Sequence, residues 1–266
     1  MQIYTNNKKI QLFLKRTESQ ELLNYFEKLQ EPVILREIRK KFPYHKHLDK
    51  DIDFLIDNGI ITRQDRRYYF SLPVIKDYPT TEIVEKVIQE ADEKYSIDEL
   101  LVWLGEILRV DEFSDILAID FIFPTFNRLE NDNFQLVTIN RAGKLPETLA
   151  NYFVNIDQPK LFPNLAPLIG DVNQEFFSNQ LDLIFDRVMA SKPPRRDSIF
   201  VDSLLTTQMI TSDPEWQLVI PFYTKSISYD FDRELDSRTR FFFVRQLAER
   251  LLADRESFTY LIKKKA

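Results

Sequence analysis

Several residue types are scarce in this chain of 266 residues, and each scarcity excludes a class of protein. Cysteine is absent, which excludes disulfides, thiolate zinc sites and cysteine nucleophiles and agrees with a reducing compartment. There are only four glycines, Gly59, Gly105, Gly143 and Gly170. No two of them are close enough to form the glycine-rich loop that binds phosphates in dinucleotide-binding or P-loop proteins. A nucleotide-dependent enzyme is therefore not expected.

Histidine is almost as scarce, because His45 and His47 are the only two. Both lie near the N-terminus, so the C-terminal part cannot contain a Ser-His-Asp triad, an HExxH zinc site or a three-histidine metal site. Any catalysis would depend on carboxylates, lysine, tyrosine or a carboxylate-bound Mg²⁺. No third type of ligand lies near the two histidines, which favours a surface or capping role for them. We expect a protein that is not an enzyme and needs no cofactor or metal.

Long apolar runs are also missing. No run approaches the roughly 20 residues that span a bilayer, and the segment from Met1 to Thr17 lacks the apolar stretch of a signal peptide. With 44% hydrophobic and 29% charged residues, the composition is that of a soluble globular protein. We therefore expect a cytoplasmic protein without membrane contact, and the length favours two domains.

Charge changes sign along the chain. The whole sequence has 36 Lys and Arg against 42 Asp and Glu, whereas residues 1–78 have 15 against 11 and residues 79–266 have 21 against 31. The first segment is thus +4 and the second −10, as expected if only the first binds a polyanion. A polar stretch with a helix-breaking proline, Lys76 to Thr80, separates the two. We predict a domain at 1–78 and an acidic body at 79–266.

The segment from residue 17 to residue 73 has three short helical patterns, a glycine stop and two strands. The first helix is expected to begin at Thr17, with Gln20 completing a capping box. The third helix should end at Gly59, since glycine adopts the left-handed conformation at low cost. The other expected elements are a strand at 33–34, a helix at 35–42, a helix with Leu48, Ile52, Leu55 and Ile56 inward, and a hairpin over 60–70 that turns at Gln64-Asp65.

The stretch from Leu48 to Phe70, LDKDIDFLIDNGIITRQDRRYYF, resembles the helix and wing of bacterial winged-helix proteins. The whole sequence also resembles a bacterial family of unknown function that has such a module at its N-terminus. The winged-helix resemblance implies a helix-turn-helix fold whose third helix enters the major groove of DNA while the wing reaches phosphates or the minor groove. The second resemblance implies no activity.

Residue by residue, the resemblance implies groove-facing positions at His45, Lys46, His47, Asp49, Lys50 and Asp53 and wing contacts at Arg63, Arg66 and Arg67. The second expected helix adds a basic face with Arg36, Arg39, Lys40 and Lys41. The predicted nucleic-acid-binding residues are Arg36, Arg39, Lys40, Lys46, Lys50, Arg63, Arg66 and Arg67.

The third helix departs from the pattern of a DNA reader. Asp49, Asp51, Asp53 and Asp57 outnumber its lysines, and carboxylates are repelled by phosphates at close range. Base reading would require Asp49 and Asp53 to point away from the exposed face. Exposure to water or a basic protein partner explains four acids more readily, and a solvated hairpin tip is an equal alternative for the wing arginines.

The body is expected to be α+β or α/β, with helix dominating. Helices are predicted from Thr81, from a capping box at Ser96, and over 147–153, 173–189 and 237–252, and strands over 134–139 and 216–223. Phe241 to Phe243 are expected to be buried in this body. The basic loop 192–196 and the lysines 263–265, taken as a frayed tail, are assigned a solubilising role by default.

An internal duplication is a minority hypothesis for this body. When residues 115–140 are laid on 197–222, Asp115 and Asp120 coincide with Asp197 and Asp202. Duplicated halves could bring these acids together as a symmetric metal pair, although capping of helices or turns is the favoured explanation for them.

Three functions follow in order of preference. The first is a non-enzymatic transcription regulator whose winged helix binds duplex DNA while the body mediates dimerisation or contact with a protein partner. The second is an adaptor that uses the winged helix to bind protein. The third, well below, is a carboxylate-dependent hydrolase built from the duplicated aspartates.

Overall fold

The computed structural model describes residues 1–266 except 92–93, 109–114, 225–234 and 265–266. The chain divides into two compact units. The first comprises Met1–Tyr78 together with Glu112–Phe121, and the second comprises Pro79–Asp111 together with Ile122–Ala266. Both contain helices and small, mostly antiparallel sheets, so the expected α+β class is confirmed.

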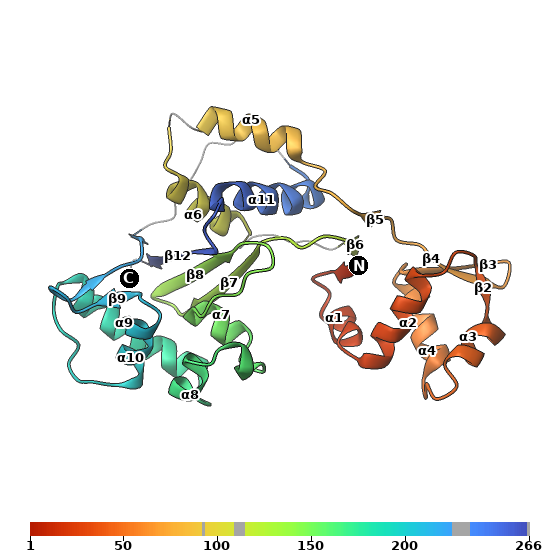
Figure 1. The fold of residues 1–266 in the computed structure, drawn as a ribbon, viewed down its shortest axis with the longest axis horizontal. Helices are drawn as coiled ribbons and strands as arrows, with labels where there is room; N and C mark the ends of the chain where they lie inside the picture. The colour runs from red at the N-terminus through yellow and green to blue at the C-terminus, as the bar shows by residue number, and fades with distance from the viewer. Residues whose placement is uncertain (92–93, 109–114, 225–234, 265–266) are drawn as a thin grey trace. The chain divides into compact units, whose positions relative to one another are not determined.

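The first unit contains two three-stranded sheets and four helices among its described residues (Figure 1). Its elements are β1 (Gln2–Tyr4), α1 (Lys8–Leu14), α2 (Thr17–Glu27), β2 (Val33–Ile34), α3 (Leu35–Lys41), α4 (Leu48–Asp57), β3 (Ile61–Gln64), β4 (Arg67–Phe70), β5 (Val74–Ile75) and β6 (Leu117–Ile119). Strands β2, β4 and β3 form an antiparallel sheet in that order. In the other sheet β6 lies between β1 and β5, so a segment from beyond residue 78 completes this unit.

The helices of this unit pack through the apolar faces expected from their spacing. Leu22 and Phe26 of α2, Ile38 of α3, and Ile52 and Leu55 of α4 are at most 2% exposed and share one core. Helix α4 ends where expected, because Gly59 adopts a positive φ of 67°. Tyr68 is buried beneath the hairpin, whereas Tyr69 and Phe70 are half-buried.

Two local predictions in this unit are wrong. The N-cap of α2 is Arg16, which makes no side-chain cap, and Gln20 donates to the carbonyl of Leu14 instead of completing a capping box. The hairpin turns at Asp65-Arg66, one residue later than expected. Both turn residues have positive φ, 50° and 63°. A two-residue turn with positive φ at both positions matches the right-handed twist of the flanking strands. This match sets the pairing register of β3 and β4.

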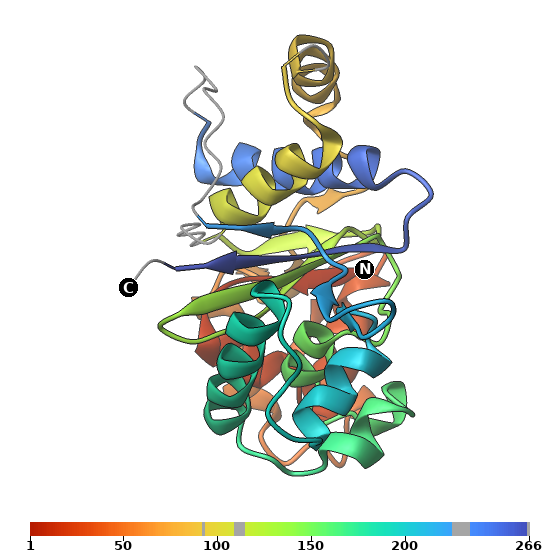
Figure 2. The same ribbon diagram turned by 90° about the vertical axis from the view of Figure 1, so that its left-hand side faces the viewer.

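The second unit is built around a four-stranded sheet in the order β11-β12-β8-β7. Its strands are β7 (Thr125–Glu130), β8 (Phe134–Asn140), β11 (Phe222–Tyr223) and β12 (Ser257–Lys263), with a separate pair β9 (Ile210–Thr211) and β10 (Gln217–Leu218). Its helices are α5 (Thr81–Ala91), α6 (Ile97–Ile107), α7 (Leu149–Val154), η2 (Pro159–Leu161), α8 (Leu165–Ile169), α9 (Gln174–Met189), α10 (Ile199–Thr206) and α11 (Ser237–Leu252). Figure 2 shows α5, α6 and α11 on one side of the sheet and α7 to α10 on the other.

Strand β8 is buried over its whole length because helices cover both faces of the sheet. Phe134 and Leu136 pack with the layer of α7 to α10, whereas Val137 and Ile139 pack with α5, α6 and α11. Its polar side chains are hydrogen-bonded on the same two sides. Gln135 donates to Glu106 of α6, and Asn140 exchanges 2.8 Å hydrogen bonds with Asn151 of α7. One strand therefore organises two hydrophobic cores.

Most predicted elements of this unit are present, including the capping box of α6 at Ser96 and the full extent of α11. Phe241 to Phe243 are at most 1% exposed, so their predicted burial is confirmed. The stretch 216–223, expected to be one strand, contains two short ones. The supposed C-terminal tail is wrong for Lys263, which ends β12 and pairs with Asp182 and Asp186 at 2.5 and 2.7 Å. Lys265 lies outside the described residues.

The hypothesis of an internal duplication is wrong as a structural repeat. Residues 115–140 form the strands β6, β7 and β8, whereas residues 197–222 begin with helix α10. The difference is local in origin, because Ser198 caps α10 by accepting from the amide of Val201, while β6 pairs with β1 and β5. A few shared polar residues do not specify the same secondary structure.

We predict that Gly105→Ala destabilises the second unit by about 1–3 kcal/mol through overpacking. A methyl group at this position of α6 would overlap the hydroxyl oxygen of Tyr260, a fully buried side chain of β12. Urea unfolding followed by tryptophan fluorescence measures the effect, because Trp103 and Trp216 both lie in this unit.

Tyr260→Phe is the matched test, since it removes only the overlapping oxygen. Added to Gly105→Ala it should recover part of the lost free energy of unfolding, whereas alone it should cost roughly 0.5–1.5 kcal/mol through lost hydrogen bonds. Strictly additive effects of the two substitutions would contradict the packing argument.

Candidate nucleic-acid interface

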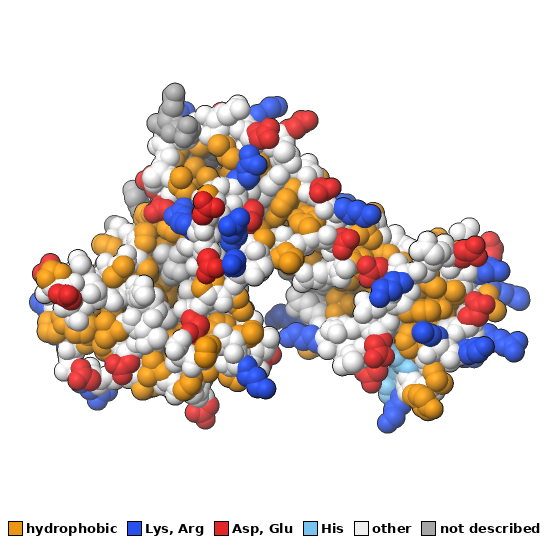
Figure 3. All heavy atoms as spheres, viewed as in Figure 1, with side chains coloured by type: hydrophobic (Ala, Val, Ile, Leu, Met, Phe, Trp, Pro, Cys, Tyr) orange, Lys and Arg blue, Asp and Glu red, His pale blue; other side chains and the backbone are white. Residues whose placement is uncertain are grey.

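Exposed basic side chains gather on α3, α4 and the β3–β4 hairpin of the first unit. All eight predicted binding residues are exposed, namely Arg36, Arg39, Lys40, Lys46, Lys50, Arg63, Arg66 and Arg67. Figure 3 shows several blue side chains over these elements of the first unit. From residue 35 to residue 70 there are nine Lys and Arg against six Asp and Glu. The surface is therefore basic. Which of its acidic side chains are exposed decides whether it can contact DNA.

The hairpin presents its three arginines in different ways. Arg66 occupies the turn itself, with its backbone in the left-handed region. Arg67 donates to the carbonyl of Pro32 at 3.0 Å, and the Arg63 guanidinium lies 5.5 Å from the ring centre of Tyr68. Arg63 and Arg67 are thus positioned by the sheet. Arg66 extends from its tip.

An ion pair joins α3 to the first turn of α4. Arg39 donates to both carboxylate oxygens of Asp49, at 3.3 and 2.6 Å. These hydrogen bonds raise the pKa of Arg39 above its usual value, so the guanidinium keeps its charge. Asp49 is exposed, but its charge is matched by a partner already in place.

Asp51 points inward rather than toward a groove. Its carboxylate is 7% exposed and accepts from Arg16 at 2.5 Å, while the ring of His45 lies 2.8 Å away. The His45 side chain is only 5% exposed, so the expectation of a groove-facing or surface His45 is wrong. The reason is tertiary, since the buried carboxylate needs a partner and Arg16 and His45 supply it.

The exposed face of α4 is formed by residues spaced three and four apart. It consists of Asp49, Lys50, Asp53 and Asp57. Both acids that base reading would require to turn away, Asp49 and Asp53, are on this face. Acidic side chains therefore dominate the surface that a winged-helix protein would place in the major groove.

Tyr44 is a surface residue that the sequence analysis missed. Its side chain is 94% exposed in the connection between α3 and α4, next to Lys46 and His47. A hollow of ≈450 Å³ lies at the same junction, lined in part by Arg39, Lys46 and Lys50. The exposure of Tyr44 could have been predicted from the sequence, because this aromatic residue after Pro43 falls outside the apolar pattern of either helix.

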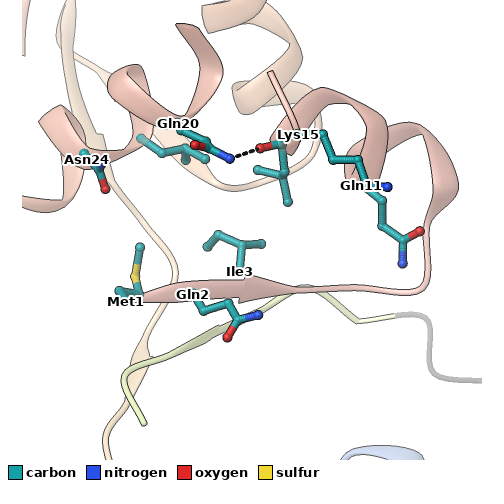
Figure 4. Close-up of a pocket in the computed structure, with 9 residues that line it drawn as sticks. Met1, Gln2, Ile3, Gln11, Lys15, Gln20 and Asn24 are labelled. Carbon is teal, nitrogen blue, oxygen red and sulfur yellow. Dashed lines mark hydrogen bonds between the residues drawn. The ribbon is translucent and has the colours of Figure 1, made fainter. Parts of the chain in front are cut away.

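A larger hollow of ≈650 Å³ lies between β1 and the helices α1 and α2 (Figure 4). It is lined by amide side chains, but two of these are engaged with the backbone. Gln11 donates to the carbonyl of Thr5 at 2.7 Å and Gln20 to that of Leu14 at 3.1 Å. This hollow therefore offers fewer convergent polar groups for a ligand than its lining residues suggest.

The aspartates of the metal hypothesis belong to different compact units. Asp115 and Asp120 belong to the first unit, and Asp197 and Asp202 to the second. Within the described residues, no cluster of three or more His, Asp or Glu side chains is arranged to hold a metal ion. In the same residues, no helix is both long enough and apolar enough to cross a membrane.

Comparison with known protein families gives a match over part of the chain. Residues 1–102 match the model of a family described as a domain of unknown function, DUF1803. The match covers the first unit up to β5, then α5 and the beginning of α6. It confirms, for these residues, the resemblance to a family of unknown function. The chain has no match among curated proteins or among solved structures.

We predict that Arg66→Asn raises the free energy of unfolding of the first unit by roughly 0.5–1 kcal/mol. Asparagine adopts the left-handed conformation more readily than arginine, whose side chain is strained there. Arg66→Ala is the matched control, because it removes the same charge without this conformational gain. Calorimetry measures the free energy of unfolding of both variants. Equal values for Arg66→Asn and Arg66→Ala would contradict the left-handed conformation at this position.

Proposed function

We propose that the first unit is a winged-helix module that binds duplex DNA mainly through phosphate contacts, in a cytoplasmic and non-enzymatic regulator. The order helix α2, strand β2, helices α3 and α4, hairpin β3–β4 is that of winged-helix proteins. The observation that supports binding is the set of eight exposed basic side chains on α3, α4 and the hairpin. Basic surfaces of this kind attract the phosphate backbone whatever the base sequence.

Phosphate contact fits the surface better than base reading does. The hairpin extends Arg63, Arg66 and Arg67 from one edge of the surface, and α3 adds Arg36 and Lys40. The acids are unevenly disposed, because Asp51 is buried with its partners and Asp49 is paired with Arg39. Among the exposed acids of α4, Asp53 and Asp57 are left to oppose a DNA groove.

Weak sequence specificity follows from this arrangement. Phosphate contacts fix position and orientation but contain no sequence information. A carboxylate can accept from a cytosine amine, yet the repulsion from flanking phosphates opposes its entry. We therefore expect the protein to bind duplexes of different sequence with similar affinity, and strongly only at low salt.

Replacing Arg63 with Gln and Arg66 with Asn should weaken binding to all duplexes alike. Each lost phosphate contact lowers the slope of log affinity against log salt by about one, so the double variant should lose about two. The measurement is fluorescence anisotropy of a labelled duplex titrated with the full chain over a range of NaCl concentrations.

The matched control removes the same charge from the second unit, by replacing Arg195 and Arg196 with Gln. These residues are exposed on a basic loop after α9, outside the proposed interface. The control should bind DNA as the unmodified protein does. Loss of affinity in the control alone, or no binding by the unmodified protein at low salt, would rule out the hairpin as the contact.

Asp53→Asn should raise affinity for duplex DNA by roughly two- to fivefold at low salt, because it removes an exposed negative charge that faces the phosphates. Asp171→Asn removes an equal charge from an exposed loop of the second unit and should leave the affinity unchanged. The same anisotropy titration compares the two. A fall in affinity with Asp53→Asn would mean that this carboxylate contacts a base.

A second function is favoured by the acidic face of α4. Asp53, Asp57 and the exposed aromatic ring of Tyr44 would suit a basic protein partner, in which case the unit serves as an adaptor. Asp53→Asn distinguishes the two functions, because it should lower the affinity for a basic protein partner and raise the affinity for DNA. Failure to bind DNA, together with partner capture that Asp53→Asn abolishes, would establish the adaptor.

A further inference from the structure

Helix α9 of the second unit has one face that its own unit does not cover. Its inward face contains Phe177, Leu181, Phe185 and Val188, which are buried in the core shared with α7, α8 and α10. A second face contains Asp182 and Asp186, which pair with Lys263 of β12. The third face is formed by Phe176, Gln180, Leu183 and Arg187, spaced as one helical stripe.

This outer stripe is unusually apolar for a surface helix. The side chain of Leu183 is 60% exposed and that of Phe176 is 54% exposed. Phe176 also contacts Phe200 of α10 edge to face, with ring centres 5.8 Å apart. Polar residues normally occupy the outward face of such a helix, so two exposed apolar residues on one stripe mark a surface suited to contact.

The basic loop 192–196 turns this stripe into one side of a groove. Arg187 donates to the carbonyl of Pro193 at 2.7 Å, which ties the loop to α9. The resulting groove has a volume of ≈540 Å³ and is lined by Leu183, Ile184 and Phe200 together with arginines of the helix and the loop. Its lining thus combines apolar and basic side chains.

The charge of the groove is opposite to that of the surrounding sequence. Arg187, Arg195 and Arg196 line it, and the one acid among its lining residues, Asp186, is already paired with Lys263. Residues 79–266 as a whole have 21 Lys and Arg against 31 Asp and Glu. A local cluster of arginines on an acidic body indicates complementarity to a negatively charged occupant.

We propose that this groove, between α9 and the loop 192–196, docks an acidic amphipathic peptide segment of a partner protein. Leucine or phenylalanine side chains of the partner contact Leu183, Phe176 and Phe200, while its carboxylates pair with Arg195 and Arg196. Helix-in-groove recognition of this kind combines an apolar stripe with flanking charges. The site is separate from the DNA-binding surface, and the proposal does not depend on it.

A peptide fits the groove better than an anionic membrane does. The hollow is concave, so it encloses a narrow segment, whereas a bilayer presents a flat surface. The large excess of acid in residues 79–266 also repels an anionic surface that extends beyond the groove, but not a segment confined to it.

The test uses a fluorescein-labelled helical peptide of about 16 residues, with Leu and Phe on one face and Glu on the other positions. The full chain should bind this peptide saturably, and its affinity should fall with salt. A peptide with Lys in place of every Glu should bind at least about tenfold more weakly. Anisotropy measures both.

Two variants of the groove separate its apolar and basic parts. Leu183→Gln, and Arg195→Glu combined with Arg196→Glu, should each weaken binding of the acidic peptide by at least about tenfold. All three residues are exposed, and tryptophan fluorescence verifies that the second unit remains folded. Leu12→Gln, which changes an equally exposed leucine on α1, is the control and should leave binding unchanged.

Three outcomes would overturn the proposal. They are no saturable binding of the acidic peptide, equal binding of the lysine peptide, and unchanged affinity in both groove variants. Vesicles of phosphatidylserine and phosphatidylcholine form a further arm of the experiment. Binding to these vesicles that Leu183→Gln abolishes, without binding of the peptide, would assign the groove to a membrane surface instead.

Discussion

Burial of β8 on both faces is the constraint on which the second unit depends. Seven consecutive residues of this strand are buried, and alternate side chains enter two different cores. Asn140 of this strand exchanges hydrogen bonds with Asn151 of α7, one of the helices that cover it. Helices α7 to α10 cover one of these faces, so the inward side of α9 packs against the core. A second side of α9 is held by the ion pair between Asp182 and Lys263 of β12. Its remaining side, with Leu183, is left exposed.

In the first unit, the pairing of charges matters more than their number. The four aspartates of α4 would repel any polyanion if all of them were exposed and without cationic partners. One of them, Asp51, is buried against Arg16 and His45, and another, Asp49, is neutralised by Arg39 of the neighbouring helix. Asp49 is exposed, whereas removing a partner of the buried Asp51 would leave its charge uncompensated, which is costly. The acids left for recognition are therefore fewer than the sequence suggests.

Element positions with strong apolar periodicity could be predicted from the sequence, and those that depend on distant partners could not. Helices α4, α9 and α11 were correctly placed, because their apolar residues repeat at helical spacing over ten or more residues. Strand β12 was missed because its alternation, with Phe258 and Tyr260 buried, lasts only four residues before the consecutive buried Leu261 and Ile262. Strand β6 was not predicted, and its residues were included in the acidic body, since its pairing with β1 and β5 joins segments distant in sequence. In the candidate site, the exposed arginines were found, whereas the inward turn of His45 and the exposure of Tyr44 were not.

By itself, the sequence determined composition, charge distribution and the local elements. The absence of cysteine, the shortage of glycine and the basic segment before residue 79 follow directly from the residues present. Only the tertiary structure decided which charges are available and which apolar residues stay uncovered. Whether Asp51 or Asp53 meets solvent depends on the neighbours that α4 packs against, and whether Leu183 is buried depends on which face of α9 meets the sheet layer. Helical spacing places residues on one face, but packing alone determines what lies opposite that face.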